Sequence, residues 1–124
     1  MNIIFRCDAS VEIGLGHLVR CMALAEDLKN KKNRIHFAIL KSNNEIKNLK
    51  KKYPVIEFNE ECFDYGKWLT DCIQKTKSEI LIMDMRDGLS LKQLKQIKIK
   101  TGVKVVTIDD PEDKRLESDL AFYP

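Results

Sequence analysis

The chain contains 124 residues, of which 44% are hydrophobic and 33% charged, and its net charge is +3 at pH 7. This length suits one domain, and the composition is that of a folded globular protein and not of a disordered chain. The small positive surplus does not indicate a nucleic-acid-binding surface, and the sequence shows neither a membrane-spanning stretch nor a secretory signal. We therefore expect a cytoplasmic protein that binds neither nucleic acid nor a membrane.

Short apolar runs alternate with amphipathic stretches along the chain. Strands are predicted over residues 2–5, 34–40, 55–58, 79–83, 103–108 and 119–122, and helices over 17–30, 45–53, 61–77 and 91–101. Strands that alternate with helices predict βαβ units and a parallel sheet with right-handed crossovers. The expected fold class is therefore α/β, a Rossmann-like doubly wound parallel sheet, with residues 1–124 forming a single domain.

Local signals support several of these elements. Ser90 has the position of a helix N-cap, and Gly102 stands where a C-terminal glycine belongs. Three consecutive lysines at 50–52 follow a predicted helix, where positive charge suits a solvated C-terminal end. One face of the first helix is apolar because its hydrophobic residues recur at steps of three and four. These residues are Leu18, Cys21, Met22, Ala25 and Leu28.

The four cysteines include no CxxC pair. The sequence therefore indicates neither a zinc site nor a thioredoxin-type site. Cys21 and Cys72 fall on apolar helix faces, where a free cysteine behaves as a small hydrophobic residue.

Three loops carry the residues that could bind a ligand or take part in a reaction. In an open parallel sheet, ligands bind beyond the carboxyl ends of the strands. The loops that follow the first, fourth and fifth predicted strands should meet at that edge. They are RCDASVEIGLGHLVRC (6–21), DMRDG (84–88) and DDPED (109–113).

The first loop contains glycines that permit a close backbone approach, Gly14 and Gly16. It lacks the third glycine and the tight turn of a dinucleotide fingerprint, and no Walker lysine follows. The sequence therefore predicts neither a nicotinamide nor an ATP site.

His17 stands at the start of the helix that follows this loop. The partial positive charge of a helix N-terminus disfavours imidazolium, so a histidine there can stay neutral and accept a proton. The alternative is a histidine that only caps the helix or packs. Arg20, one turn later, could hold a phosphate or a carboxylate, or could form a surface ion pair with Glu26 or Asp27.

Acidic and hydroxyl residues give further candidates. Asp8 and Ser10 could bind sugar hydroxyls or stabilise the turn through local backbone bonds. Asp84 either contacts a ligand or fixes a neighbouring loop. Asp109 and Asp110 could together bind a metal, but no histidine or third acid stands at ligand spacing. We expect no metal and no other cofactor.

The segment RCDASVEIGLGHLVRCMALAEDL closely resembles the opening of the PseG-type UDP-sugar hydrolases of the pseudaminic acid pathway. The spore-coat polysaccharide biosynthesis family is similar in the same region. The shared pattern is Arg-x-Asp-Ala/Ser-Ser followed by Ile-Gly-x-Gly-His-x-x-Arg. It is met by Arg6, Asp8, Ala9, Ser10, Ile13, Gly14, Gly16, His17 and Arg20. The later segments EILIMD and TGVKVVTIDD also resemble the family, so the resemblance covers nearly the whole chain.

The resemblance implies the N-terminal domain of a glycosyltransferase-B-like architecture, with an active site between two Rossmann-like halves. It implies metal-independent hydrolysis of UDP-2,4-diacetamido-2,4,6-trideoxy-β-L-altropyranose to UDP and the free sugar. The histidine that matches His17 would be the catalytic base. The matching substrate-binding positions would be Arg6, Asp8, Ser10, Gly14, Gly16, Arg20, Asp84 and Asp109.

The chain departs from the family in two respects. After Asp84 the family has His-Tyr-Gly, whereas this chain has Met85, Arg86 and Asp87. No second domain that could hold the nucleotide follows within these 124 residues.

We therefore expect the sugar-side catalytic half of a UDP-sugar hydrolase in surface polysaccharide or pseudaminic acid biosynthesis. Its partners would be a UDP-sugar or free sugar and a separate nucleotide-binding half, or a second copy in a homodimer. The alternatives are a non-catalytic binding or assembly module and a fragment of a glycosyltransferase.

Overall fold

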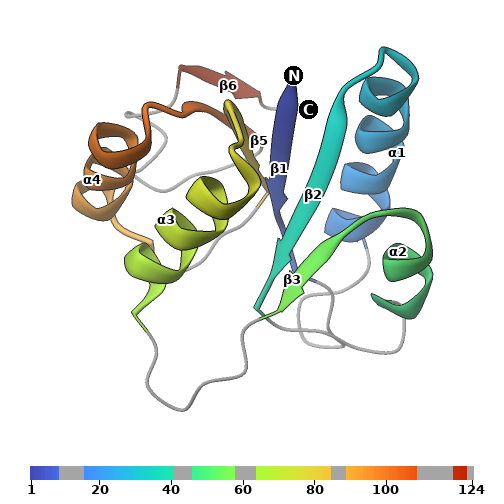
Figure 1. Ribbon diagram of the computed structural model, residues 1–124, viewed down its shortest axis with the longest axis horizontal. Helices are drawn as coiled ribbons and strands as arrows, with labels where there is room; N and C mark the ends of the chain where they lie inside the picture. Colours follow the sequence, from blue (N-terminus) through green and yellow to red (C-terminus); the bar gives the residue numbers. More distant parts are fainter. Residues whose placement is uncertain (9–15, 41–45, 58–63, 85–88, 109–118, 123–124) are drawn as a thin grey trace.

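The computed structural model describes residues 1–8, 16–40, 46–57, 64–84, 89–108 and 119–122. Within these ranges the strands and helices alternate as the sequence predicts (Figure 1). In the same ranges, no helix combines the length and the apolar character that crossing a membrane requires.

A six-stranded sheet forms the centre of the fold. Its strands lie in the order β3-β2-β1-β4-β5-β6, and every paired neighbour runs parallel. From β1 the chain builds outward to β3, then returns beside β1 and builds in the other direction, which is a doubly wound arrangement. The predicted α/β fold is therefore confirmed. The strands are β1 (Asn2–Arg6), β2 (Arg34–Ile39), β3 (Val55–Glu57), β4 (Ile80–Met83), β5 (Lys104–Ile108) and β6 (Leu120–Phe122).

Helices cover both faces of the sheet (Figure 1). Helices α1 (Gly16–Asn30) and α2 (Ile46–Lys52) lie on one face, and α3 (Tyr65–Thr76) and α4 (Leu91–Thr101) lie on the other. The central strands consequently bury both faces, which explains their nearly continuous apolar sequences.

Successive strand residues alternate between two cores. On the side of α1 and α2, the rings of Phe5 and Phe37 stack with centroids 5.0 Å apart. On the side of α3 and α4, Ile4 and Leu81 are fully buried among residues of those helices. The apolar face predicted for α1 packs into the first core, where Cys21 and its neighbours are buried.

The ends of α3 and α4 are set by their caps. The side chain of Ser90 accepts a hydrogen bond from the Gln93 amide, and the Gln93 side chain accepts one from the Ser90 amide. This capping box confirms the predicted start of α4. Helix α3 starts at Tyr65, later than the predicted residue 61. Asp64 has an extended backbone and caps the helix, because its side chain accepts a hydrogen bond from the Lys67 amide.

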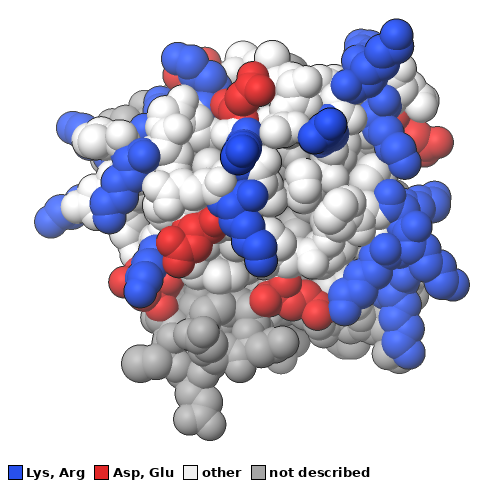
Figure 2. All heavy atoms as spheres, in the orientation of Figure 1, with Lys and Arg blue, Asp and Glu red and all other residues white. Residues whose placement is uncertain are grey.

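Lysines gather over α2 on the face drawn in Figure 2. Lys50, Lys51 and Lys52 occupy its last turn and are exposed. Positive charge there offsets the partial negative charge of the helix C-terminus. The lysine run is thus the solvated helix end that the sequence predicts.

The C-caps of α3 and α4 provide a matched pair of stability tests. Both cap residues are left-handed, with φ of 53° at Lys77 and 71° at Gly102. A side chain in this conformation costs about 1 kcal/mol, although space around Gly102 is open. We expect Gly102→Ala to lower the free energy of unfolding by about 1 kcal/mol and Lys77→Gly to raise it by up to about as much. Urea unfolding of both variants measures these changes, and the same sign for both would contradict the cap argument.

Candidate active site

The carboxyl ends of β1 and β4 form the point at which the winding of the sheet reverses. In doubly wound folds this is where ligands bind. Three residues named from the sequence lie there: Arg6 ends β1, Asp8 follows it and Asp84 follows β4. Helix α1 begins at the same edge, because it follows the loop after β1.

Arg6 and Asp8 form a buried ion pair. Arg6 Nη1 lies 2.7 Å from Asp8 Oδ1, Arg6 Nη2 lies 3.2 Å from Asp8 Oδ2, and the two side chains are 0% and 1% exposed. Alternate residues of an extended segment point to the same side, which brings this Arg-x-Asp pair together. The bidentate geometry satisfies both charges in the interior.

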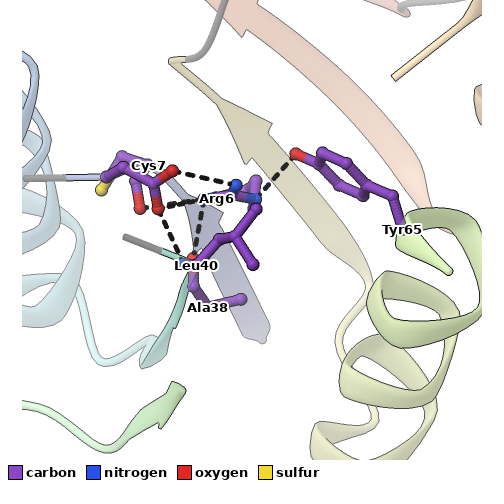
Figure 3. Close-up of polar contacts among 6 residues, drawn as sticks. Arg6, Cys7, Ala38, Leu40 and Tyr65 are labelled. Atoms are coloured by element: carbon purple, nitrogen blue, oxygen red, sulfur yellow. Dashed lines mark hydrogen bonds and ion pairs between the residues drawn. The ribbon is translucent and has the colours of Figure 1, made fainter. Parts of the chain in front are cut away.

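Aromatic rings of α3 enclose the Arg6 guanidinium. Figure 3 shows Tyr65 reaching Arg6 from α3, and the Tyr65 hydroxyl accepts a 2.7 Å hydrogen bond from Arg6 Nε. The guanidinium carbon lies 5.2 Å from the centroid of the Tyr65 ring and 5.3 Å from that of Trp68. These distances are those of cation–π contacts, so α3 is held to β1 by the same cation that binds Asp8.

Asp8 also holds the neighbouring strand. Its Oδ1 atom accepts a 2.8 Å hydrogen bond from the backbone amide of Leu40, just after β2. Arg6 Nη1 donates to the carbonyl of Ala38 at 3.4 Å. The ion pair therefore connects β1, β2 and α3 at the edge where the site is expected.

A second ion pair connects α1 to β4. Arg20 Nε and Nη2 donate to Asp84 Oδ2 and Oδ1 at 2.8 and 2.5 Å. The Asp84 side chain is 1% exposed and that of Arg20 is 35% exposed. Asp84 therefore fixes a neighbouring element, as one of its two alternatives expected, but that element is helix α1 and not a loop. The ion-pair partner described for Arg20 is therefore Asp84, and not Glu26 or Asp27 as considered from the sequence. Contact of Arg20 or Asp84 with a ligand stays a prediction.

Two buried thiols lie beside the second ion pair. Cys21 Sγ donates to Asp84 Oδ2 at 3.7 Å. A hydrogen bond with Cys7, burial and the negative charge of Asp84 raise the pKa of the Cys21 thiol far above its ordinary value. Cys21 therefore stays protonated and acts as a hydrogen-bond donor, not as a nucleophile.

Helical spacing places position 17 close to these groups. Gly16 is the first residue of α1 and His17 the second, so His17 precedes Arg20 and Cys21 by one turn. The predicted start of this helix is confirmed. The role of His17 as a base and the substrate contact of Gly16 stay predictions. Ser10, Gly14 and Asp109 lie outside the described residues, as does the 85–88 segment.

Metal binding is not indicated by the parts of the chain that the structure describes. They bring together no group of three His, Cys, Asp or Glu side chains that could hold an ion. Asp109 and Asp110, the acidic pair considered for a metal, lie outside those parts.

Sequence reasoning missed the aromatic partners of Arg6. The sequence patterns described above single out neither Tyr65 nor Trp68. The available signal was an arginine at the end of an otherwise apolar central strand, since such a cation must find buried partners. Aromatic residues at the start of a helix that packs on this strand are suitable ones.

The comparisons with known proteins bear on this site. No family model matches the chain, and no solved structure gives a significant match. The chain is 36% identical over 110 residues to the UDP-2,4-diacetamido-2,4,6-trideoxy-beta-L-altropyranose hydrolase of Campylobacter jejuni. The resemblance to the N-terminal part of a PseG-type UDP-sugar hydrolase is confirmed. The match covers 89% of this chain and 37% of the Campylobacter hydrolase, so this chain spans little more than a third of that relative.

Removing Arg6 tests how much its ion pair with Asp8 contributes to the free energy of unfolding. Arg6→Met keeps an unbranched apolar stem but leaves the buried Asp8 carboxylate without its guanidinium, so we expect a loss of about 3–5 kcal/mol in the free energy of unfolding. Lys50→Met is the control, because the exposed pair of Lys50 with Glu57 contributes less than about 1 kcal/mol. Similar losses in the two variants, measured by urea unfolding, would contradict the structural role of Arg6.

Cys72 predicts an alkaline loss of stability. Burial and the nearby Asp71 raise the pKa of its thiol from 9.0 to about 11. Above pH 9 the unfolded chain releases this proton while the folded chain keeps it, so stability falls as pH rises toward 11. Between about pH 8 and pH 10, the free energy of unfolding should fall in both proteins. We expect the fall in Cys72→Ala to be smaller than that in the wild type by on the order of 1 kcal/mol, after allowance for solvent screening. Urea unfolding at several pH values measures how the free energy of unfolding of each protein depends on pH. The same dependence in both proteins would contradict the raised pKa of Cys72.

Proposed function

We propose that this chain is the sugar-side part of a UDP-sugar hydrolase and that it acts together with a nucleotide-binding half. The observation that carries the proposal is the 36% identity to the N-terminal part of the Campylobacter hydrolase over 89% of this chain. The doubly wound sheet supports it, because it brings the family's Arg-x-Asp pair and the start of α1 to the edge where such folds bind ligands. By the family's arrangement, this half would belong to a glycosyltransferase-B-like architecture.

The proposed reaction is hydrolysis at the anomeric carbon of the sugar. The imidazole of His17 accepts a proton from water as the water oxygen bonds to that carbon. The bond between the anomeric carbon and the phosphate oxygen breaks, and its electron pair leaves with UDP. One positioned base suffices for this step because UDP is a good leaving group. The helix N-terminus favours the neutral imidazole that the step requires.

The ion pair of Arg6 with Asp8 serves this site indirectly in the proposal. Arg6 is fully buried and Asp8 is 1% exposed, and each is engaged with other parts of the protein. Their described contacts stabilise the edge of the sheet. Ser10 and the glycines of the first loop remain the proposed contacts for the sugar.

The cellular setting belongs to the same proposal. Cys7, Cys21 and Cys72 are free and buried, which suits a reducing cytoplasm. The pathway would be the synthesis of pseudaminic acid or of another surface polysaccharide.

A non-catalytic binding module is the second candidate. The sequence after Asp84 favours it, because Met85, Arg86 and Asp87 replace the His-Tyr-Gly of the family. Such a module would bind the sugar or a partner half without turning the substrate over.

A complementation assay tests the proposed activity. The remaining C-terminal part of the Campylobacter hydrolase can be supplied as a separate chain or fused after Pro124, and UDP release from the UDP-sugar is followed. We expect turnover with the added half, and at least an ~100-fold loss of kcat in His17→Ala, because a general base typically contributes that much. His36→Ala is the matched control, since His36 lies on β2 and carries no proposed role.

The outcomes separate the candidates. Turnover that survives His17→Ala would remove the histidine from the mechanism. Sugar binding detected by calorimetry, with no product in the presence of the added half, would favour the non-catalytic module. In H₂¹⁸O, label in the free sugar and not in UDP is expected for attack at the anomeric carbon.

A further inference from the structure

Asp84 receives three hydrogen bonds from two consecutive residues of α1. Arg20 supplies Nε and Nη2 at 2.8 and 2.5 Å, and Cys21 supplies its thiol at 3.7 Å. The backbone of Asp84 is fixed as well, because its amide donates to the carbonyl of Arg6 at 3.1 Å. Asp84, which directly follows β4, thus binds β1 through its backbone amide and α1 through its side chain.

These contacts are directional, unlike the apolar packing below them. The core residues of α1 keep its apolar face on the sheet, but apolar contacts are not directional and do not fix the exact position of the helix along its axis. A bidentate guanidinium–carboxylate pair fixes both distance and orientation. Because the Asp84 side chain is only 1% exposed, water does not readily replace these partners.

The state of Cys21 reinforces the arrangement. The neighbouring Cys7, burial and the Asp84 carboxylate raise the pKa of the Cys21 thiol, so it keeps its proton. The thiol is therefore a standing donor to Asp84. Cys7, the residue that directly follows β1, is buried in the same core as Cys21.

Position 17 lies three residues before Arg20 on the same helix, which is about 4.5 Å along its axis. A shift or rotation of the second turn therefore moves position 17 by a comparable amount. Displacements of about 1 Å at a reacting group can lower a rate by about 100-fold. The anchor at Asp84 thus lies close enough to control the geometry at His17.

We infer that Asp84 is a positioning residue, which fixes the first two turns of α1 against the carboxyl end of β4 and so sets the place of His17. This rests on the proposed function, in which His17 is the base. Arg20 and Cys21 are the two side chains through which Asp84 acts. In this role Asp84 acts through Arg20 and Cys21 of α1 and not by contact with the substrate.

The first experiment separates kcat from KM in the complemented enzyme. We expect Asp84→Asn to lower kcat at least ~10-fold and to leave KM within about threefold, because the amide no longer matches the Arg20 fork. Asp119→Asn is the matched control, since Asp119 accepts from the Val105 amide and pairs with Lys98 beside β5. It should leave kcat unchanged. A rise in KM with kcat retained would instead assign Asp84 to substrate binding and overturn the inference.

A pair of Cys21 variants probes the same anchor without changing a charge. Cys21→Ser keeps a donor for Asp84, whereas Cys21→Ala removes it. We expect the serine variant to retain more of kcat than the alanine variant, at equal KM. Equal kcat in both variants would remove the thiol from the anchor.

Amide hydrogen exchange of the chain alone makes the test independent of catalysis. Asp84→Asn should accelerate exchange in the first two turns of α1 and leave α4 unchanged. Unchanged exchange in α1 would overturn the inference even if the enzyme is active. If the wild-type complex shows no turnover, the proposed function fails, and faster exchange in α1 would still show that Asp84 anchors the helix.

Discussion

The buried pairing of Arg6 with Asp8 is the constraint on which the carboxyl edge of the sheet depends. An ionised side chain in the interior requires charge pairing and hydrogen bonds on all sides. Arg6 meets this requirement by drawing on Asp8, on the carbonyls of Cys7 and Ala38, and on the Tyr65 hydroxyl. Three elements must therefore come together for one cation to be tolerated. The arrangement of β1, β2 and α3 at this edge follows from the need of Arg6 for several partners at once, more than from the energy of any one hydrogen bond.

The two carboxylates at this edge have parallel tasks on opposite sides of β1. Asp8 connects β1 to the end of β2, and Asp84 connects β4 to α1. Between them the sheet reverses its winding, and the start of α1 lies there. Acidic residues that look like ligands in the sequence can thus be the supports of a site. The burial of such residues, and not their chemical identity, distinguishes a supporting carboxylate from one that contacts a ligand.

Sequence patterns predicted the fold closely because local rules and tertiary packing agree in this chain. The capping box at Ser90 and the apolar stripe through Cys21 are local features, and both are confirmed. The start of α3 was placed too early, because an amphipathic pattern does not reveal which acidic residue caps the helix. Local patterns do not identify Tyr65 as a partner of Arg6 or Asp84 as a partner of Arg20. Tyr65 and Asp84 are distant in sequence, and only the folded topology brings them near.

The place of β1 in the middle of the sheet also affects how the chain can be synthesised. Its neighbour on one side, β2, ends at Ile39, but its neighbour on the other side begins only at Ile80. A nascent chain on the ribosome therefore carries an open edge on its first strand while about forty more residues emerge. In the first part of that interval, before α3 has emerged, Arg6 also lacks Tyr65. Until residue 83 has left the exit tunnel, this edge of β1 is open to pairing with another chain.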